Sequence, residues 1–133
     1  MKKLVVLTGS GISSESGLKT FRETGGLWEN YDVMEVASPT GWAKNRELVL
    51  KFYNERRAQL RDAVPNDGHK GLVGLEPHFD VHIITQNVDN LHERAGSRKV
   101  LHLHGILTRA RSTGDPSLTY DIGYDPILPG DTC

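Results

Sequence analysis

Apolar residues are arranged in two ways along the chain, as short continuous runs and as longer stretches with helical spacing. The runs cover 3–8 (KLVVLT), 79–85 (FDVHIIT) and 99–104 (KVLHLH), and their length suits strands. In the first and last, the apolar residues are nearly continuous, which is typical of strands covered on both faces of a parallel sheet. Because stretches with helical spacing separate the runs, the pattern predicts an α/β fold with a parallel sheet.

Besides a helix near Ser13, three helices are predicted between these strands. Residues 45–62 carry one apolar-to-amphipathic stripe. Residues 67–75 contain three glycines, each of which costs about 1 kcal/mol relative to alanine inside a helix, so we expect this helix to depend on packing. Residues 90–95 are followed by Gly96, a residue suited to a left-handed helix cap. The stripe of the first helix consists of Leu48, Val49, Phe52, Tyr53, Arg56 and Leu60.

The remaining segment, 106–133, is rich in Gly, Pro, Asp and Ser and predicts loops with one short hairpin. Three strands are few for a doubly wound sheet, and the sequence stops within its least regular segment. We therefore expect these residues to be a piece of something longer.

Composition and charge exclude several classes of protein. The chain has 133 residues, 37% hydrophobic and 25% charged, with a net charge of −1 and no dominant block of Lys or Arg, so nucleic acid is not expected as a partner. The apolar run 4–7 is shorter than the roughly 7–15 residues of a signal peptide, and no run approaches the roughly 20 residues of a membrane span. A single cysteine, Cys133, excludes an internal disulfide and favours a reducing, cytoplasmic compartment.

A glycine-containing loop directly follows the first predicted strand. Gly9 and Gly11 would let the backbone approach a ligand, and a helix beginning near Ser13 would offer N–H groups to a pyrophosphate. The pattern GxGxxS lacks the last glycine of the dinucleotide fingerprint, so a plain tight turn stays an alternative. In the loop that follows, Phe21 could anchor the loop to the core, and Arg22 could pair with a phosphate.

Polar side chains gather where the second and third strands end. Gln86, Asn87 and Asp89 offer the donors and acceptors that ribose hydroxyls and a carboxamide require. An Asx-turn with a helix cap would account for one or two of them but leaves Gln86 unexplained. His104 follows at the same carboxyl edge, where an imidazole suits proton transfer at neutral pH. His102 lies deeper in the strand and is interpreted as structural.

Four motifs, GSGISSESGLKTFR, TQNVD, LHERAG and HLHG, together resemble the sirtuin family of NAD-dependent protein deacylases. The resemblance covers nearly the whole chain. It implies the N-terminal part of a Rossmann-like NAD-binding domain over 1–105, which includes a helical cofactor-loop and acyl-pocket segment at 20–62. Residues 106–133 would begin a small domain, and the second half of the Rossmann-like domain would be absent.

The resemblance also implies NAD as cofactor and acylated lysine side chains of proteins as substrates. His104 would be the general base that helps deprotonate a ribose hydroxyl after nicotinamide has left. The residues implied to bind NAD are Gly9, Ser10, Gly11 and Ile12 at the pyrophosphate, Arg22 near phosphate, Phe21 at the nicotinamide site, Gln86 at the ribose, and Asn87 with Asp89 at the carboxamide pocket.

Tyr53 and Arg56 are three residues apart, so their side chains share one helix face. Spacing alone favours a solvated charged face for Arg56. However, Tyr-x-x-Arg is similar to the signature of sirtuins that remove succinyl and malonyl groups, in which a guanidinium and a phenol would bind the terminal carboxylate. Lys19 and Thr20, which depart from the usual family motif, resemble the same subgroup.

The segment after the HLHG motif departs from the family. Most sirtuins hold a structural zinc there with four cysteines, whereas this segment supplies one thiol, so we expect no metal. The later strands, including a Gly-Thr-Ser loop for the adenosine half, are also missing, so we expect the chain alone to be inactive or poorly active. The alternatives are an inactive NAD- or ADP-ribose-binding fragment and a protein ADP-ribosyltransferase.

Overall fold

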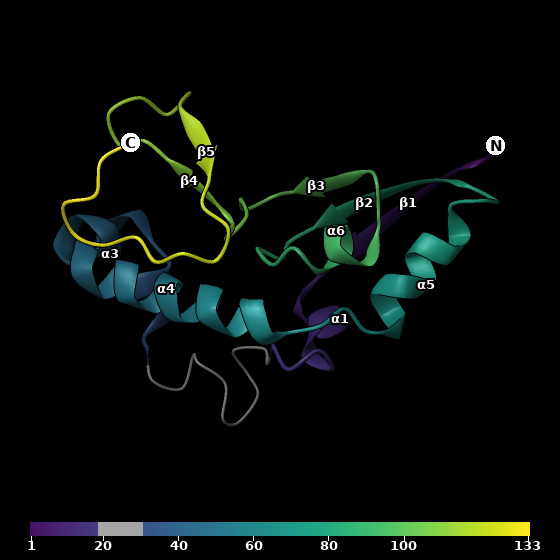
Figure 1. Ribbon diagram of the computed structural model, residues 1–133, viewed down its shortest axis with the longest axis horizontal. Coiled ribbons are helices and arrows are strands. Elements are labelled where there is room, and N and C mark those ends of the chain that lie inside the picture. Colours follow the sequence, from purple (N-terminus) through teal and green to yellow (C-terminus); the bar gives the residue numbers. More distant parts are fainter. Residues whose placement is uncertain (19–30) are drawn as a thin grey trace. The chain divides into compact units, whose positions relative to one another are not determined.

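The computed structural model describes residues 1–18 and 31–133, which form two compact units (Figure 1). The first unit contains Met1–Thr20 and Ala63–Ile106, and the second contains Phe21–Asp62 and Leu107–Cys133. Among the described helices, none combines the length and the apolar character that crossing a membrane requires.

The first unit is built on a parallel sheet of three strands, as the sequence predicts. The strands β1 (Lys3–Thr8), β2 (Asp80–Thr85) and β3 (Val100–His102) are neighbours in this order, and both pairings are parallel. The bounds of β1 match the prediction, and β2 begins one residue later than predicted. The prediction for β3 was too long at both ends: the strand begins at Val100, one residue later than predicted, and residues 103–104 already form a turn.

Three helices accompany this sheet: α1 (Ser10–Ser14), α5 (Asp67–Leu75) and α6 (Leu91–Ala95). The bounds of α5 match the prediction, and the predicted left-handed cap after α6 is confirmed, with φ 113° at Gly96. The expected start near Ser13 was wrong for α1, which begins three residues earlier. Gly9 is extended there and serves as the N-cap, so the turn from strand to helix takes a single residue.

The packing of α5 against α1 explains one of the three glycines in α5. A Cβ at Gly68 would lie 3.2 Å from Cγ1 of Ile12 and 3.0 Å from Oδ1 of Asn66. The same Asn66 caps the helix, because its Oδ1 accepts a hydrogen bond from the Gly68 N–H at 2.9 Å and its Nδ2 donates to the Ile12 carbonyl at 2.7 Å. The start of α5 is therefore fitted directly to the residue that follows the glycine turn.

The two faces of the sheet differ in burial. On one face Val81 and Ile83 are buried, and a hydrogen bond from β1 to α6 shows that α6 packs there. On the other face Val5 is 56% exposed, Leu7 64% and Leu101 57%. The expectation that β1 and β3 are covered on both faces was therefore wrong for this chain, in which the described residues cover only one face.

The second unit contains α2 (Val33–Val36), α3 (Pro39–Lys44), α4 (Arg46–Asp62) and a hairpin of β4 (Arg109–Arg111) and β5 (Thr119–Asp121). The predicted hairpin is confirmed by the antiparallel pairing of its strands. Helix α4 begins one residue after the predicted start, because Oδ1 of Asn45 accepts a hydrogen bond from the Leu48 N–H at 3.1 Å and so caps the helix.

Helix α4 also holds the loops of the second unit. The Asn54 amide donates to the Ile127 carbonyl at 2.8 Å and accepts from the Ile127 N–H at 2.8 Å. Arg57 is 4% exposed, and it donates to Oδ1 of Asn54 at 2.5 Å and to the Leu107 carbonyl at 3.4 Å. Together Asn54 and Arg57 bind main-chain atoms near both ends of the segment 107–133.

Candidate functional site

The three strands of the first unit end in one row at the carboxyl edge of the sheet. Thr8 is in register with Thr85, and Thr85 with His102. Residues in register on parallel neighbouring strands point to the same face, so these three side chains form a polar row. In α/β folds, ligands bind outside the carboxyl ends of the strands, and this row therefore lies at the edge where a site is expected.

The glycine turn leaves this edge with its backbone accessible. Ser10 and Gly11 are exposed, and Gly9 is partly exposed. A Cβ at Gly9 or Gly11 would meet no atom within 4 Å, so open space lies next to the main chain at both positions. Ile12 follows, partly buried against α5. An accessible main chain with small side chains fits a phosphate-bearing cofactor such as NAD.

Asn87 joins the glycine turn to the end of β2. Its Nδ2 donates to the carbonyl of Gly9 at 2.9 Å, and its backbone N–H donates to Oγ1 of Thr85 at 3.0 Å. The residue is only 8% exposed. Gln86, by contrast, is exposed, and its backbone N–H donates to the Thr8 carbonyl at 3.0 Å. The structure thus brings Gly9, Gln86 and Asn87 together at one edge, as predicted.

Asp89 is the member of this cluster that the turn-and-cap alternative explains. Its Oδ2 accepts a hydrogen bond from the Ser13 hydroxyl at 2.8 Å, and its Oδ1 accepts from the Leu91 N–H at 3.0 Å. The carboxylate is 6% exposed and links α1 to the first turn of α6. It lies two residues after Asn87 in sequence and so stays in the cluster, but both of its oxygens serve the fold.

His104 lies just beyond the carboxyl end of β3. It was predicted within the strand, whereas it occupies the turn that begins at Leu103, and its ring is exposed. In the part of the chain that the structure describes, no hydrogen bond engages this ring. Gly105 follows with φ 81°, a left-handed conformation that other residues adopt only with strain, and it turns the chain away from the sheet.

A buried polar network beneath the glycine turn was not predicted. The rings of His69 and His92 meet edge to face with centroids 5.1 Å apart, and neither residue is exposed. Nδ1 of His69 accepts from the Asn66 N–H at 3.2 Å, so the neutral ring carries its proton on Nε2, 3.4 Å from the Ser13 hydroxyl. Nε2 of His92 lies 2.9 Å from Oγ1 of Thr8. Sequence spacing gave no signal for these contacts, because they join residues far apart in the chain.

Both histidines favour the neutral state, which leads to a prediction for stability. Burial lowers the pKa of His69 although Asp89 opposes it, and burial with the nearby His69 lowers the pKa of His92. In the unfolded chain both would titrate near an ordinary value of about 6.5. Their contribution to the free energy of unfolding is therefore present above this value and is lost as the pH falls below it.

Urea denaturation at pH 7.5 and pH 5.5 would measure this loss. We expect His92→Gln to reduce the difference in unfolding free energy between the two pH values, whatever it does to stability at pH 7.5. The matched control is His78→Gln, because His78 is exposed. A pH dependence that is the same in His92→Gln and in the unaltered chain would contradict the assignment.

Two predicted acyl-pocket residues lie in the second unit, on α4. Cζ of Arg56 is 5.5 Å from the ring centroid of Phe52 and 5.8 Å from that of Tyr53, so the guanidinium lies over aromatic rings and next to the phenol-bearing side chain. Arg56 and Tyr53 are both partly exposed. The neighbouring Arg57 is 4% exposed, so it does not belong to a solvated charged face with Arg56. Phe21 and Arg22 lie outside the described residues.

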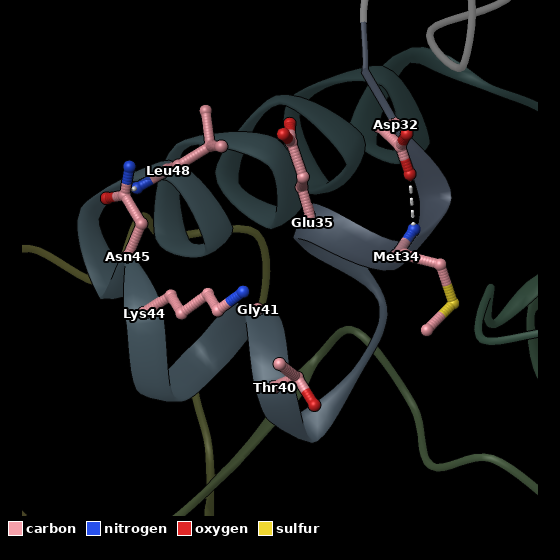
Figure 2. Close-up of a pocket in the computed structure, with 8 residues that line it drawn as sticks. All are labelled: Asp32, Met34, Glu35, Thr40, Gly41, Lys44, Asn45 and Leu48. Atoms are coloured by element: carbon pink, nitrogen blue, oxygen red, sulfur yellow. Dashed lines mark hydrogen bonds between the residues drawn. The ribbon is translucent and has the colours of Figure 1, made fainter.

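A separate pocket of about 330 Å³ lies between α2, α3 and the start of α4 in the second unit (Figure 2). Gly41 allows the close approach of α3 and α2 there, because a Cβ would lie 2.1 Å from the Glu35 carbonyl oxygen. None of the predicted site residues lines this pocket. Its lining consists of Asp32, Met34, Glu35, Thr40, Gly41, Lys44, Asn45 and Leu48.

The residues after β3 do not fit the four-cysteine zinc site of most sirtuins. Cys133 is exposed, with its Sγ 3.4 Å from Oγ of Ser112. In the described ranges 1–18 and 31–133, no group of three or more His, Cys, Asp or Glu side chains is placed to hold a metal ion. The prediction that this chain binds no zinc stays a prediction.

Comparison with known proteins supports the resemblance. The sequence profile of the Sir2 family matches residues 9–120. An NAD-dependent protein deacylase of Helicobacter pylori (strain J99) is 63% identical over 120 residues, which are 90% of this chain and 51% of that protein.

Solved structures agree with the sequence match. A Sir2 homologue in complex with NAD superposes with a TM-score of 0.85 at 43% identity, over 97% of this chain and 51% of the other. A Sir2 homologue variant in complex with 2′-O-acetyl-ADP-ribose has a TM-score of 0.85 at 45% identity, over 97% and 52%. The chain thus spans about half the length of these relatives. Its fold is the Rossmann-like α/β fold of the sirtuins, and the chain belongs to the Sir2 family.

Proposed function

We propose that the protein carrying this chain is an NAD-dependent protein-lysine deacylase. The observation that carries the proposal is the hydrogen bond from Asn87 to Gly9, which joins the glycine turn to the polar end of β2 at the same sheet edge as His104. In a member of the Sir2 family, this edge is the expected place for the nicotinamide half of NAD.

The candidate residues would bind different parts of NAD. The accessible main chain of Gly9 to Gly11, with Ser10 and Ile12, would hold the pyrophosphate, and Arg22 and Phe21 are proposed to contribute at the phosphate and nicotinamide. Gln86 is exposed next to Asn87, where its amide can bind ribose hydroxyls. Asn87 uses its Nδ2 on Gly9, which leaves its Oδ1 as an acceptor for a carboxamide. Asp89 would act by fixing Ser13 and α6 around this cluster.

His104 is proposed as the general base. When bound, NAD supplies a ribose carbon that accepts the acyl-lysine carbonyl oxygen as nicotinamide leaves. A ring nitrogen of His104 would then take the proton from a ribose hydroxyl, so that this oxygen can bond to the acyl carbon. The bond from the acyl carbon to the lysine nitrogen would break, the lysine would leave as the free amine, and one water molecule would complete O-acyl-ADP-ribose. The exposure of the ring at the carboxyl edge supports this role, because a base must reach a hydroxyl outside the fold.

We further propose that succinyl and malonyl groups are preferred over acetyl. Arg56 lies over the Phe52 and Tyr53 rings, and a guanidinium next to a phenol can bind a terminal carboxylate through several hydrogen bonds. An acetyl group offers no such partner. The substrates would be acylated lysine side chains of proteins, and the single thiol supports a reducing, cytoplasmic compartment.

A nicotinamide-release assay with NAD and a succinyl-lysine peptide tests the proposal. We expect release coupled to loss of the succinyl group in a protein of the relatives' full length, and little or none from the 133 residues alone. Robust turnover by the 133-residue chain would refute the second expectation. Release of nicotinamide without deacylation would favour protein ADP-ribosylation instead, and tight NAD binding without release would favour a binding fragment.

A further inference from the structure

His102 is held between two hydrogen-bond acceptors at the end of β3. Its Nδ1 lies 2.9 Å from the Asn87 carbonyl oxygen, and its Nε2 lies 2.5 Å from Oε1 of Glu93. A carbonyl oxygen and a carboxylate can each accept a hydrogen bond, but neither can donate one. A neutral imidazole has one N–H and can satisfy only one of them. This geometry therefore fits an imidazolium that donates from both ring nitrogens.

The charges around His102 favour the same state. Its side chain is 11% exposed, whereas that of Glu93 is 36% exposed. Burial alone would lower the pKa of His102, but hydrogen bonds to Glu93 and Asn87 and the charges of Glu93 and Asp89 raise it above the ordinary value. His92, the other titratable group facing it from α6, favours the neutral state because burial lowers its pKa. Burial raises the pKa of Glu93, but the hydrogen bond from His102, a backbone hydrogen bond and the charges of His102 and His92 together lower it below its ordinary value.

This imidazolium acts on the residue that joins the two halves of the candidate site. The Asn87 N–H is bound by Thr85, its side chain by Gly9, and its carbonyl by His102. These three contacts fix the peptide on both sides of the Asn87 side chain. Without His102, the contact on the carbonyl would be lost, and a displacement near 1 Å at a site can cost about 100-fold in rate.

We propose that His102 is a positioning residue, which as an imidazolium paired with Glu93 fixes the Asn87 turn for binding nicotinamide. The role rests on the proposed function, because it assigns Asn87 to the nicotinamide pocket. It predicts an activity that declines at alkaline pH, as His102 loses its proton and one of its two acceptors loses a donor.

Kinetics test the role in a deacylase of full length. We expect His102→Leu to lower kcat/KM for NAD by about 10- to 100-fold. His102→Asn should retain more activity, because its side-chain amide can still donate to the Asn87 carbonyl. Glu93→Gln should move the alkaline limb of the pH profile to lower pH, and His102→Leu should remove this limb. The matched control is His82→Leu, a histidine of β2 that pairs with Asp80 away from the edge. Equal effects of His102→Leu and His82→Leu would overturn the proposal.

Nuclear magnetic resonance of the 133-residue chain separates this role from the proposed function. At pH 7 both ring nitrogens of His102 should carry protons, and Glu93→Gln should convert the ring to a neutral tautomer. The Asn87 side-chain amide signal should shift in His102→Leu and stay in place in His82→Leu. The proposal would be overturned by a neutral His102 ring in the unaltered chain, or by an Asn87 signal that does not shift in His102→Leu. Either result would hold whether or not the protein deacylates. If both magnetic resonance results are as expected but the protein of full length releases no nicotinamide, the proposed function is contradicted instead.

Discussion

Replacing His104 with alanine is expected to abolish deacylation while NAD still binds. The ring is exposed at the carboxyl edge and takes no part in the buried network, so the substitution removes a proton acceptor without disturbing the fold. General-base catalysis contributes about 100- to 10,000-fold, and we expect kcat/KM for a succinyl-lysine peptide to fall by that amount. Chromatographic measurement of deacylated peptide gives the rate, and isothermal titration calorimetry gives the affinity for NAD.

The control for this experiment is His78→Ala, which removes another exposed histidine at a distance from the edge. It should leave both rate and affinity unchanged. Deacylation that survives His104→Ala would contradict the role of general base. Loss of deacylation with continued transfer of ADP-ribose to protein would instead identify the alternative activity, since that reaction uses the same cofactor cleavage with a different acceptor.

Replacing Arg56 with methionine is expected to change substrate choice. Methionine keeps much of the length and apolar contact of the side chain over Phe52 and Tyr53 but removes the guanidinium. A hydrogen bond to a charged group contributes about 1.5–3 kcal/mol, so kcat/KM for succinyl-lysine should fall about 10- to 100-fold. For acetyl-lysine we expect a change within about 3-fold, because no carboxylate contact is lost. Parallel assays with the two peptides measure both values.

Arg61→Met is the matched control, because Arg61 is exposed near the end of the same helix and pairs with Asp62. It should affect neither substrate. Equal losses for succinyl and acetyl peptides in Arg56→Met would show that the arginine supports the helix or the cofactor site, and would remove the basis for the acyl preference.

Strongly patterned elements of the fold could be predicted from the sequence. The strand 3–8 and the helix 67–75 have the bounds that their apolar spacing and flanking residues indicate. The end of β3 was missed because apolar residues continue through Leu103. The strand ends where its pairing with β2 ends, at Thr85, and the sequence of β3 alone does not show that position. Helices α2 and α3 were expected only as part of a helical segment over 20–62, without bounds of their own. Two capping residues mark their starts: Asp32 accepts from the Met34 N–H, and Ser38 accepts from the Gly41 N–H.

The sequence predicted which residues gather at the carboxyl edge of the sheet, but not what each of them binds. Gln86, Asn87 and Asp89 follow a strand end, which is enough to bring them near the glycine turn. Their separate tasks depend on partners distant in sequence, such as Ser13 for Asp89. The burial of Arg57 next to the partly exposed Arg56 could not be predicted for the same reason. Helical spacing places both residues near the apolar stripe, and Arg57 is the one that donates to the Leu107 carbonyl of a distant loop.

The contact between Asn54 and Ile127 constrains the loops of the second unit through the main chain alone. Both hydrogen bonds involve main-chain atoms of Ile127, so the anchor does not depend on which side chain follows Pro126. Proline is the exception at position 127, since it has no N–H to donate. Side chains of this loop can therefore change without loss of its attachment to α4.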